Sequence, residues 1–256
     1  MTRKKKEKRG NSVFSGAKWN AVNQGATNAI RLVVSVVVAR ILAPEDFGLL
    51  AMAFIFIGFL NVFKDMGTVD AIIQRKNNTK DFLNSVFIFN VIIGLLSWIF
   101  IIAASPAISW FFGESRLVGI LSLMGVSFFI HSFGFVNRAL IQKSMRFRTL
   151  AIIEISAISC NSTLAIILAL AGFGVWALAW GFVFGAICLN IMIWYVSSWR
   201  PKIYFKWKNI QSILNFSLNL TISNIFGYFI SNSDSLLIGR FLGSSPLGFY
   251  RASAQT

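Results

Sequence analysis

The sequence has few charged residues, and acidic residues are the scarcest of them. Only 13% of the 256 residues are Asp, Glu, Lys or Arg, whereas a typical soluble domain has about 25%. Hydrophobic residues make up 56% of the chain, and the mean hydropathy is +0.69. Long stretches therefore avoid water, which excludes ordinary soluble folds and indicates an all-α, polytopic transmembrane helical bundle.

Residues that ordinarily carry catalysis or bind metals are also rare. Cys160 and Cys188 both lie in apolar segments without the spacing of a metal site, and there is a single histidine. The chain has no Asp-x-Asp pair and no phosphate-binding Gly-x-x-x-x-Gly-Lys-Ser/Thr loop. We therefore predict that the protein is not an enzyme and has no metal and no cofactor.

Proline is scarce, and its four positions help to delimit the helices. A membrane span needs about 20 apolar residues, and the sequence offers seven such stretches before another begins after Pro246. The predicted spans are 19–42, 47–73, 82–104, 117–142, 150–171, 175–199 and 210–242. We expect every proline at or just beyond a span end, where a missing N–H does least harm. The prolines are Pro44, Pro106, Pro201 and Pro246.

Basic residues are plentiful, and the formal net charge is +15. They alternate with the apolar spans instead of gathering in one domain, so we expect no nucleic-acid partner. Most of the 24 Lys and Arg residues fall in the amino-terminal tail and in the second, fourth and sixth connections. The positive-inside rule therefore predicts a multi-pass plasma-membrane protein with a cytoplasmic N-terminus. The tail is also expected to touch anionic membrane lipids.

The chain contains an internal repeat. Residues 35–48 align without a gap with residues 235–248, and Ser, Arg, Leu and Gly coincide in the two copies. Because an even number of spans lies between the copies, they run in the same direction, as in transporters with parallel repeats. We therefore predict a basic cytoplasmic tail over 1–13, a six-helix lobe over 14–205 and the start of a second lobe over 206–256.

One face of the first predicted span is polar. Its members recur at steps of three and four residues, which places them along one side of a helix. They are Asn20, Gln24, Thr27, Asn28, Arg31 and Ser35. Arg31 is expected near mid-membrane, where a guanidinium costs at least about 2.5 kcal/mol. Either Arg31 meets an anion in a wet substrate cavity, or it pairs with a buried acid. The candidate acids are Asp65, Asp70 and Asp234.

The seventh predicted span repeats this pattern at the same offset, with Asn224 and Ser231 among its polar residues. We expect the two polar faces, one from each lobe, to bound a central cavity. In the second span, Lys64 and Asp65 belong to a polar cluster that is either an ion-pair network or a substrate contact. Together with Asp70 and Asp234, they are candidates for ion pairing or ion coupling.

Several stretches, taken in order, resemble bacterial polysaccharide flippases. They are residues 65–76, 137–148, 172–178, 198–201, 236–243 and 247–250. The last two read Leu-Leu-Ile-Gly-Arg-Phe-Leu-Gly and Leu-Gly-Phe-Tyr. By these motifs the chain resembles the polysaccharide transporter family of the multidrug/oligosaccharidyl-lipid/polysaccharide superfamily. Within that family it is most similar to the colanic-acid and teichuronic-acid exporters.

The resemblance implies export of undecaprenyl-pyrophosphate-linked oligosaccharides across the bacterial plasma membrane, for surface polysaccharide or lipopolysaccharide biosynthesis. The anionic diphosphate of such a lipid would suit Arg31, and its sugars would suit the amides and hydroxyls beside it. The family also has two full lobes. Either the sequence is a truncated fragment, which we favour, or two copies associate, or the missing lobe is a separate chain.

Two other functions are considered. A drug or toxin extruder of the same superfamily exports cations and favours an acidic cavity, whereas the predicted cavity contains Arg31. A membrane-embedded enzyme of glycan assembly needs large loops or a His/Asp pair at the membrane surface. The predicted outward loops, 43–46, 112–116 and 172–174, are too short to hold an acceptor sugar.

Overall fold

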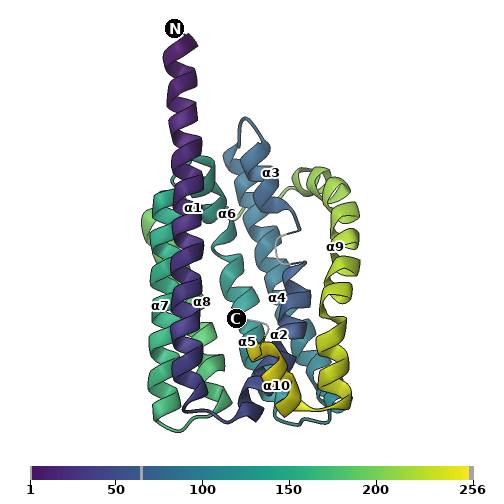
Figure 1. The fold of residues 1–256 in the computed structure, drawn as a ribbon. Coiled ribbons are helices and arrows are strands. Elements are labelled where there is room, and N and C mark those ends of the chain that lie inside the picture. The colour runs from purple at the N-terminus through teal and green to yellow at the C-terminus, as the bar shows by residue number, and fades with distance from the viewer. Residues whose placement is uncertain (1, 64–65, 254–256) are drawn as a thin grey trace.

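The computed structural model describes the backbone of residues 2–63 and 66–253, and within these ranges it contains ten helices and no strand (Figure 1). Side chains are described for most of these residues, with the main gaps at residues 2–15 and 214–224. The helices are α1 (Thr2–Ala39), α2 (Pro44–Asn61), α3 (Thr68–Gln74), α4 (Lys80–Phe112), α5 (Leu117–Ser132), α6 (Phe135–Lys143), α7 (Phe147–Leu170), α8 (Val175–Val196), α9 (Trp207–Phe241) and α10 (Ser244–Ser253).

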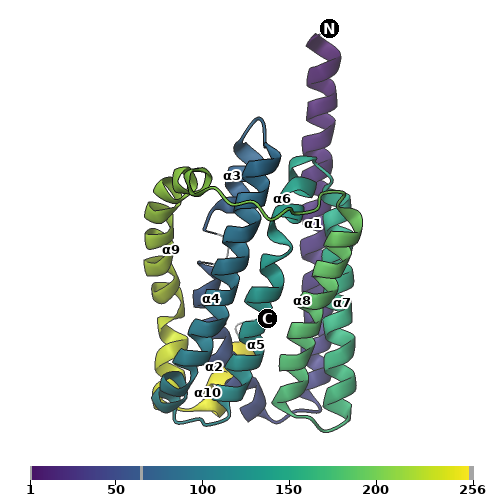
Figure 2. The same cartoon turned by 180° about the vertical axis from the view of Figure 1, so that it is seen from behind.

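The helices follow the predicted spans, and the protein is a multi-pass membrane protein. Among the described residues, five helices are long and apolar enough to cross a membrane, or six when the bent pair α5–α6 counts as one span. The predicted seventh span corresponds to α9, which has 35 residues but is not among those candidates. Figures 1 and 2 show the long helices side by side, with their connections at two opposite ends.

Two spans that we predicted as continuous helices are interrupted. The second breaks between α2 and α3, where Met66 and Gly67 have left-handed φ angles of 43° and 72°. The fourth bends by 49° between α5 and α6. In that break the Trp194 indole of α8 donates to the Phe133 carbonyl at 2.9 Å, so a backbone acceptor released by the bend is satisfied.

Local sequence signals explain several helix ends. Pro44 opens α2, and Glu45 and Asp46 follow in its first turn, where negative charge is favourable. The Thr79 hydroxyl caps α4 by accepting from the Phe82 N–H at 3.3 Å. Gly113 ends α4 with a φ of 73°, a conformation that costs glycine little.

The position of Pro106 differs from our prediction, because α4 continues through it to Phe112. A proline has no N–H, so the Ile102 carbonyl loses its helical partner. The Ser105 hydroxyl donates to that same carbonyl at 2.9 Å, and Ser105 is fully buried. This side chain replaces the missing hydrogen bond, which explains how the helix tolerates an internal proline.

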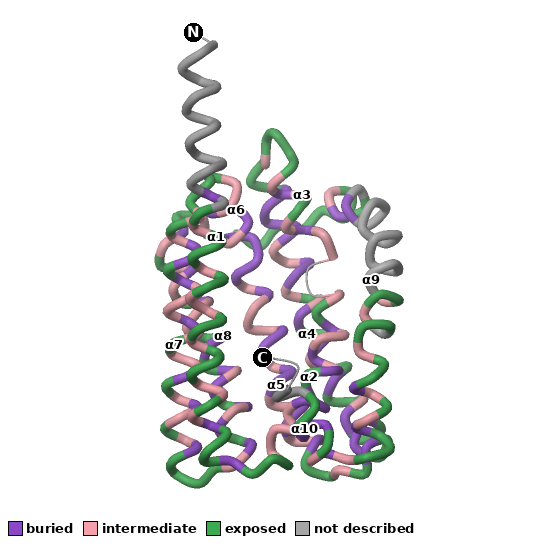
Figure 3. The backbone as a smooth tube through the Cα atoms, viewed as in Figure 1, coloured by how far each residue is buried: buried purple, intermediate pink, exposed green. Residues whose placement is uncertain are grey.

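The largest apolar core lies between α2, α4 and α5. Its fully buried members include Met52, Ile57, Leu121 and Met124, and Leu247 of α10 joins it from the far end of the chain. Figure 3 shows buried segments along these inner helices and exposed ones along α1 and α9. Many exposed side chains of the outer helices are themselves apolar, as expected for a surface that faces lipid.

We expect Ser105→Ala to destabilise the protein by about 1 kcal/mol more than Ser127→Ala does. Both serines are buried, and each donates to the carbonyl three residues earlier. Only the acceptor of Ser105 lacks a backbone N–H partner, because of Pro106. Thermal unfolding of both variants in detergent measures the difference, and equal melting temperatures would show that Ser105 does not compensate for the proline.

Candidate functional site

The polar face predicted for the first span lies along α1 and is largely uncovered. Asn20, Gln24, Asn28 and Arg31 are exposed, while Thr27 and Ser35 are half-buried. The Thr27 hydroxyl donates to the Asn23 carbonyl at 2.8 Å, and the Ser35 hydroxyl donates to the Leu32 carbonyl at 2.9 Å. The amides and the guanidinium of this face are therefore the groups that remain available to a ligand. We call these six residues the α1 stripe.

Two other faces of α1 have different surroundings. Val38 is buried against α7 and α8, in a small core with Leu42, Ala169 and Ala177. A separate exposed face is apolar, and its members are Val22, Leu32, Val33 and Val36, which are 44–64% exposed. Arg31 and Val33 lie two residues apart, so they point about 160° away from each other around the helix. An apolar exposed face suits lipid, and the centre of the α1 stripe lies about 140° around the helix from the centre of this face.

The carboxylate of Glu154, which lies outside the predicted site, connects three helices beside the stripe. Glu154 of α7 accepts hydrogen bonds from Asn23 of α1 and from Arg138 of α6, one on each carboxylate oxygen. The side chain of Glu154 is 23% exposed and that of Arg138 is 40% exposed. Nearby, the Arg148 guanidinium lies 5.4 Å from the ring of Trp19. These contacts fix how α1 sits on α7, and so they orient the stripe.

The equivalent polar face on α9 is not beside the α1 stripe. Figures 1 and 2 both show α1 and α9 on opposite flanks of the bundle. Ser231 is exposed, whereas the side chain of Asn224 lies outside the described residues. Tyr228 of α9 donates to the Ile55 carbonyl of α2 at 2.5 Å, and it passes over Gly58, where a β-carbon would lie 2.4 Å from the phenol oxygen.

The predicted ion-pairing residues are only partly described. Lys64 and Asp65 lie outside the described residues. Asp70 is exposed in the first turn of α3, and Asp234 accepts a hydrogen bond from Tyr250 of α10. Among the residues that the structure describes, Arg31 forms no ion pair. Within the described residues, Arg31 therefore pairs with neither Asp70 nor Asp234.

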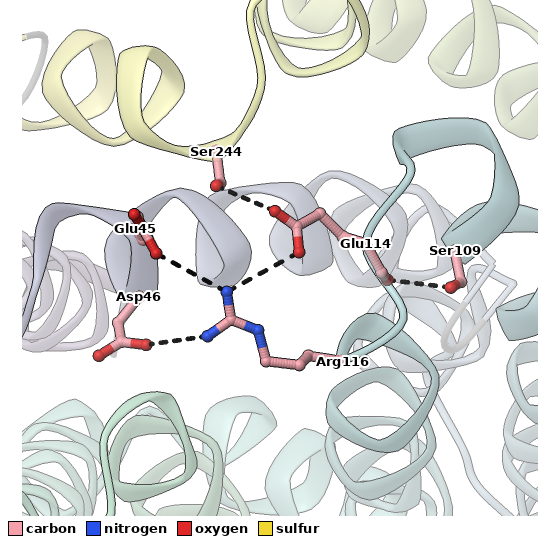
Figure 4. A network of polar contacts seen from close by, with 6 residues as sticks. All are labelled: Glu45, Asp46, Ser109, Glu114, Arg116 and Ser244. Carbon is pink, nitrogen blue, oxygen red and sulfur yellow. Dashed lines mark hydrogen bonds and ion pairs between the residues drawn. The ribbon is translucent and has the colours of Figure 1, made fainter.

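At one end of the bundle, charged residues join the start of α2 to the turn between α4 and α5 (Figure 4). The guanidinium of Arg116 lies 3.9 Å from Glu45, 3.9 Å from Asp46 and 3.8 Å from Glu114. Glu114 also accepts a hydrogen bond of 3.1 Å from Ser244, the first residue of α10. Because Arg116 is 47% exposed, each ion pair adds well under 1 kcal/mol.

The two copies of the internal repeat touch each other at this end. A β-carbon on Gly48 would lie 1.7 Å from the Ser244 carbonyl oxygen, and one on Gly248 would lie 2.5 Å from the Pro44 carbonyl oxygen. Positions 44 and 244 correspond in the repeat, and so do positions 48 and 248. The contact is therefore reciprocal, which is the arrangement that an approximate two-fold axis produces. It brings the backbones of α2 and α10 together.

The described part of the chain contains no group of three or more His, Cys, Asp or Glu side chains that is arranged to hold a metal ion. Cys160 and Cys188 are both free thiols. The groups that the α1 stripe leaves available to a ligand are its amides and one guanidinium.

Comparisons with known proteins agree with this architecture. The family model for "Polysaccharide biosynthesis protein" matches residues 37–256. The chain is 26% identical over 235 residues to the succinoglycan biosynthesis transport protein ExoT of Rhizobium meliloti, covering 92% of this chain and 48% of that protein. It is 27% identical to the lipopolysaccharide biosynthesis protein WzxC of Escherichia coli, covering 93% and 49%.

A Gram-positive protein is similarly related. The teichuronic acid biosynthesis protein TuaB of Bacillus subtilis is 28% identical over 249 residues, which cover 95% of this chain and 51% of TuaB. The chain thus spans about half the length of the curated relatives it matches.

A solved structure shares the fold. It is the inward-facing conformation of a multidrug resistance MATE family transporter of the MOP superfamily, with a TM-score of 0.63 and 18% identity. The match covers 89% of this chain and 57% of that one. At this identity the similarity establishes the transporter-like arrangement of helices and nothing about cargo.

We expect Glu154→Ala to lower the unfolding free energy by about 1–3 kcal/mol, because it leaves Arg138 and Asn23 without their shared acceptor. Arg138→Ala should cost less once Glu154 is already absent. Thermal unfolding of the two single variants and the double variant measures this coupling. Glu45→Ala is the control, since its carboxylate is 60% exposed and 3.9 Å from its partner, and a similar loss there would contradict a special role for Glu154.

Proposed function

Because this chain belongs to a family of polysaccharide biosynthesis proteins, we propose that it works in a transporter that moves a lipid-linked oligosaccharide across the bacterial plasma membrane. Its N-terminus would be cytoplasmic, since the tail and the connections next to α3, α6 and α8 carry most of the Lys and Arg residues. The end that contains Arg116 and Ser244 would then face outward.

The observation that carries this proposal is the α1 stripe. A guanidinium and several amides are uncovered at a depth where hydrocarbon would otherwise surround them, and the lipid-suited face of the same helix points elsewhere. Arg31 lies eight residues before the end of α1, about 12 Å along the helix axis. Such a face is stable when it borders water or a polar ligand.

The cargo chemistry matches the side chains of the stripe. A diphosphate group is a dense anion, and a guanidinium binds phosphate oxygens through two parallel N–H donors. Sugar hydroxyls can exchange hydrogen bonds with Asn20, Gln24 and Asn28. The acyl tail of the carrier lipid would stay in the bilayer beside the bundle. The opposite wall of the cavity would come from second-lobe helices, on another chain or on a second copy.

The reciprocal glycine contact supports alternating access. With α2 and α10 in backbone contact, the end assigned above as outward would be closed, and the stripe would be reached from the cytoplasmic side. Opening outward requires this contact to separate. Only small residues permit such close backbone approach, and ion pairs at partly exposed sites add little, so the closure is reversible at modest cost.

A drug extruder of the same superfamily is the second candidate function. The fold is shared with a multidrug resistance transporter, but a cationic cargo would be repelled by Arg31. A glycan-assembling enzyme is less well supported, because the connections at the outward end, residues 40–43, 113–116 and 171–174, are short.

We expect Arg31→Ala to reduce glycan export by about tenfold to a hundredfold, the loss of one or two hydrogen bonds to a charged group. Arg31→Lys should retain part of the activity, because it keeps the charge and loses the paired donors. Arg40→Ala is the matched control, since it removes an exposed arginine just beyond the end of the same helix. The readout is lipid-linked glycan that reaches the outer leaflet.

Two results would overturn the assignment. Export that is unchanged by Arg31→Ala would exclude the stripe as the cargo site. Efflux of a cationic dye that depends on this chain, with glycan export unaffected, would favour the extruder.

We expect Gly48→Ala to hold the outward end open, because its β-carbon would collide with the Ser244 carbonyl. A cysteine at Leu247, a position with no exposed surface in this structure, reports the opening by reacting with an impermeant maleimide. The background carries Cys160→Ser and Cys188→Ser. Gly25→Ala is the control, since nothing lies within 4 Å of its β-carbon position. Equal protection of Leu247→Cys in the Gly48 and Gly25 variants would show that this contact does not close the end.

A further inference from the structure

The segment between α8 and α9 is an extended connection at the end of the bundle where the basic residues gather, and its role is not explained by the transport proposal. Figure 2 shows it crossing that end from α8 to α9. We call residues 200–208 the strap. It comprises the end of the connection and the first two residues of α9.

Buried polar side chains of α4 hold one edge of the strap. The Lys202 N–H donates to the Asn84 side-chain oxygen at 3.0 Å, and the Lys206 N–H donates to the Ser85 hydroxyl at 3.1 Å. Asn84 is 4% exposed and Ser85 is fully buried. Since these anchors belong to the first turns of α4, the strap is attached to the first lobe at a fixed depth.

The side chains that leave the strap are both apolar and basic. Ile203 is 102% exposed, Trp207 55%, Phe205 44% and Tyr204 40%. Lys202, Lys206 and Lys208 are exposed between them. Exposed aromatic and aliphatic side chains at one place are unfavourable in water and indicate a surface that is covered. Because lysines alternate with these apolar side chains, the surface suits a partner that has an apolar interior and an anionic outer layer.

The strap also lies at the right depth for such a covering. The apolar helix α8 ends at Val196, and Trp207 begins α9, so the strap runs where membrane helices leave the hydrocarbon. Tryptophan and tyrosine are enriched at this level, where their rings reach the acyl boundary and their polar atoms reach the headgroups. A soluble protein or a nucleic acid would not offer hydrocarbon at this position.

We propose that the strap is a binding surface for anionic phospholipids of the cytoplasmic leaflet. Ile203, Phe205 and Trp207 enter the boundary of the acyl chains, and the lysine ammonium groups meet the headgroup phosphates. The leaflet assignment rests on the orientation stated under the proposed function, while the preference for anionic lipid rests on the strap alone. The lipid would hold the first lobe at a set level while the two lobes move.

The test measures the depth of the strap in bilayers of defined charge. Ile203→Cys in the Cys160→Ser, Cys188→Ser background carries a nitroxide, and the protein is placed in nanodiscs of phosphatidylcholine alone or mixed with phosphatidylglycerol. Collision with oxygen and with a water-soluble nickel chelate gives the depth of the label. We expect the label in the bilayer, and deeper when the anionic lipid is present.

Charge-removing variants separate specific attraction from simple proximity to the membrane. Lys206→Gln with Lys208→Gln should weaken the attraction by about fivefold for each lysine, or about 25-fold for the pair. The increase in label depth should then be largely lost at the phosphatidylglycerol content that produces it with both lysines present. Lys76→Gln with Lys80→Gln is the matched control, because it removes two exposed charges from the same end of the bundle but off the strap. A label at Ile191, which is 63% exposed and lies more than one turn inside α8, is the reference for a site within the hydrocarbon.

Three results would overturn the proposal. The first is a label at position 203 that collides with the aqueous nickel chelate as often as a label at a solvent-exposed site does. The second is a label depth that anionic lipid leaves unchanged, and the third is a control pair that abolishes the shift as fully as the strap pair does. None of these depends on glycan export, which the Arg31 variants measure separately, so a failed strap and a failed transporter assignment are distinguishable.

Discussion

The cost of placing polar groups in hydrocarbon is the constraint on which the rest of this structure depends. It leaves helices as the form of the spanning segments, because every backbone N–H and C=O then has a partner within its own segment. Where the helical pattern fails, at Pro106 and at the Phe133 break, a side chain from the same or a neighbouring helix supplies the missing hydrogen bond. The same cost makes the uncovered guanidinium of Arg31 informative.

The faces of α1 show how one helix satisfies several surroundings at once. Its apolar exposed face suits lipid, its face around Val38 packs on α7 and α8, and its stripe remains polar. Glu154 sets the rotation of this helix, since it binds Asn23 beside the stripe and Arg138 on a third helix. The proposed recognition surface and the carboxylate that supports it thus belong to different helices.

The reciprocal contact of Gly48 and Gly248 links the internal repeat to the proposed mechanism. In a parallel repeat the two copies of a segment are related by an axis along the membrane normal, so equivalent residues meet where the copies lie nearest that axis. Residues without side chains allow the backbones to touch there. In the proposed mechanism, a closure built from small residues and a partly exposed ion cluster would hold an end shut without a large energetic barrier to opening.

Hydropathy, charge alternation and the polar periodicity determined the membrane class, the approximate spans and the α1 stripe, while the resemblance to flippases rested on ordered sequence motifs. These features could be predicted because each depends on the local surroundings of one helix, which composition and period record directly. Sequence patterns did not reveal the breaks in two spans, the course of α4 through Pro106 or the role of Glu154 as a shared acceptor. The cavity that we expect between the polar faces of α1 and α9 stays a prediction, and the two helices lie on opposite flanks of the bundle. Those outcomes depend on which helices the connections bring together, and a hydrogen-bond partner or a close glycine contact exists only once two distant segments are packed side by side.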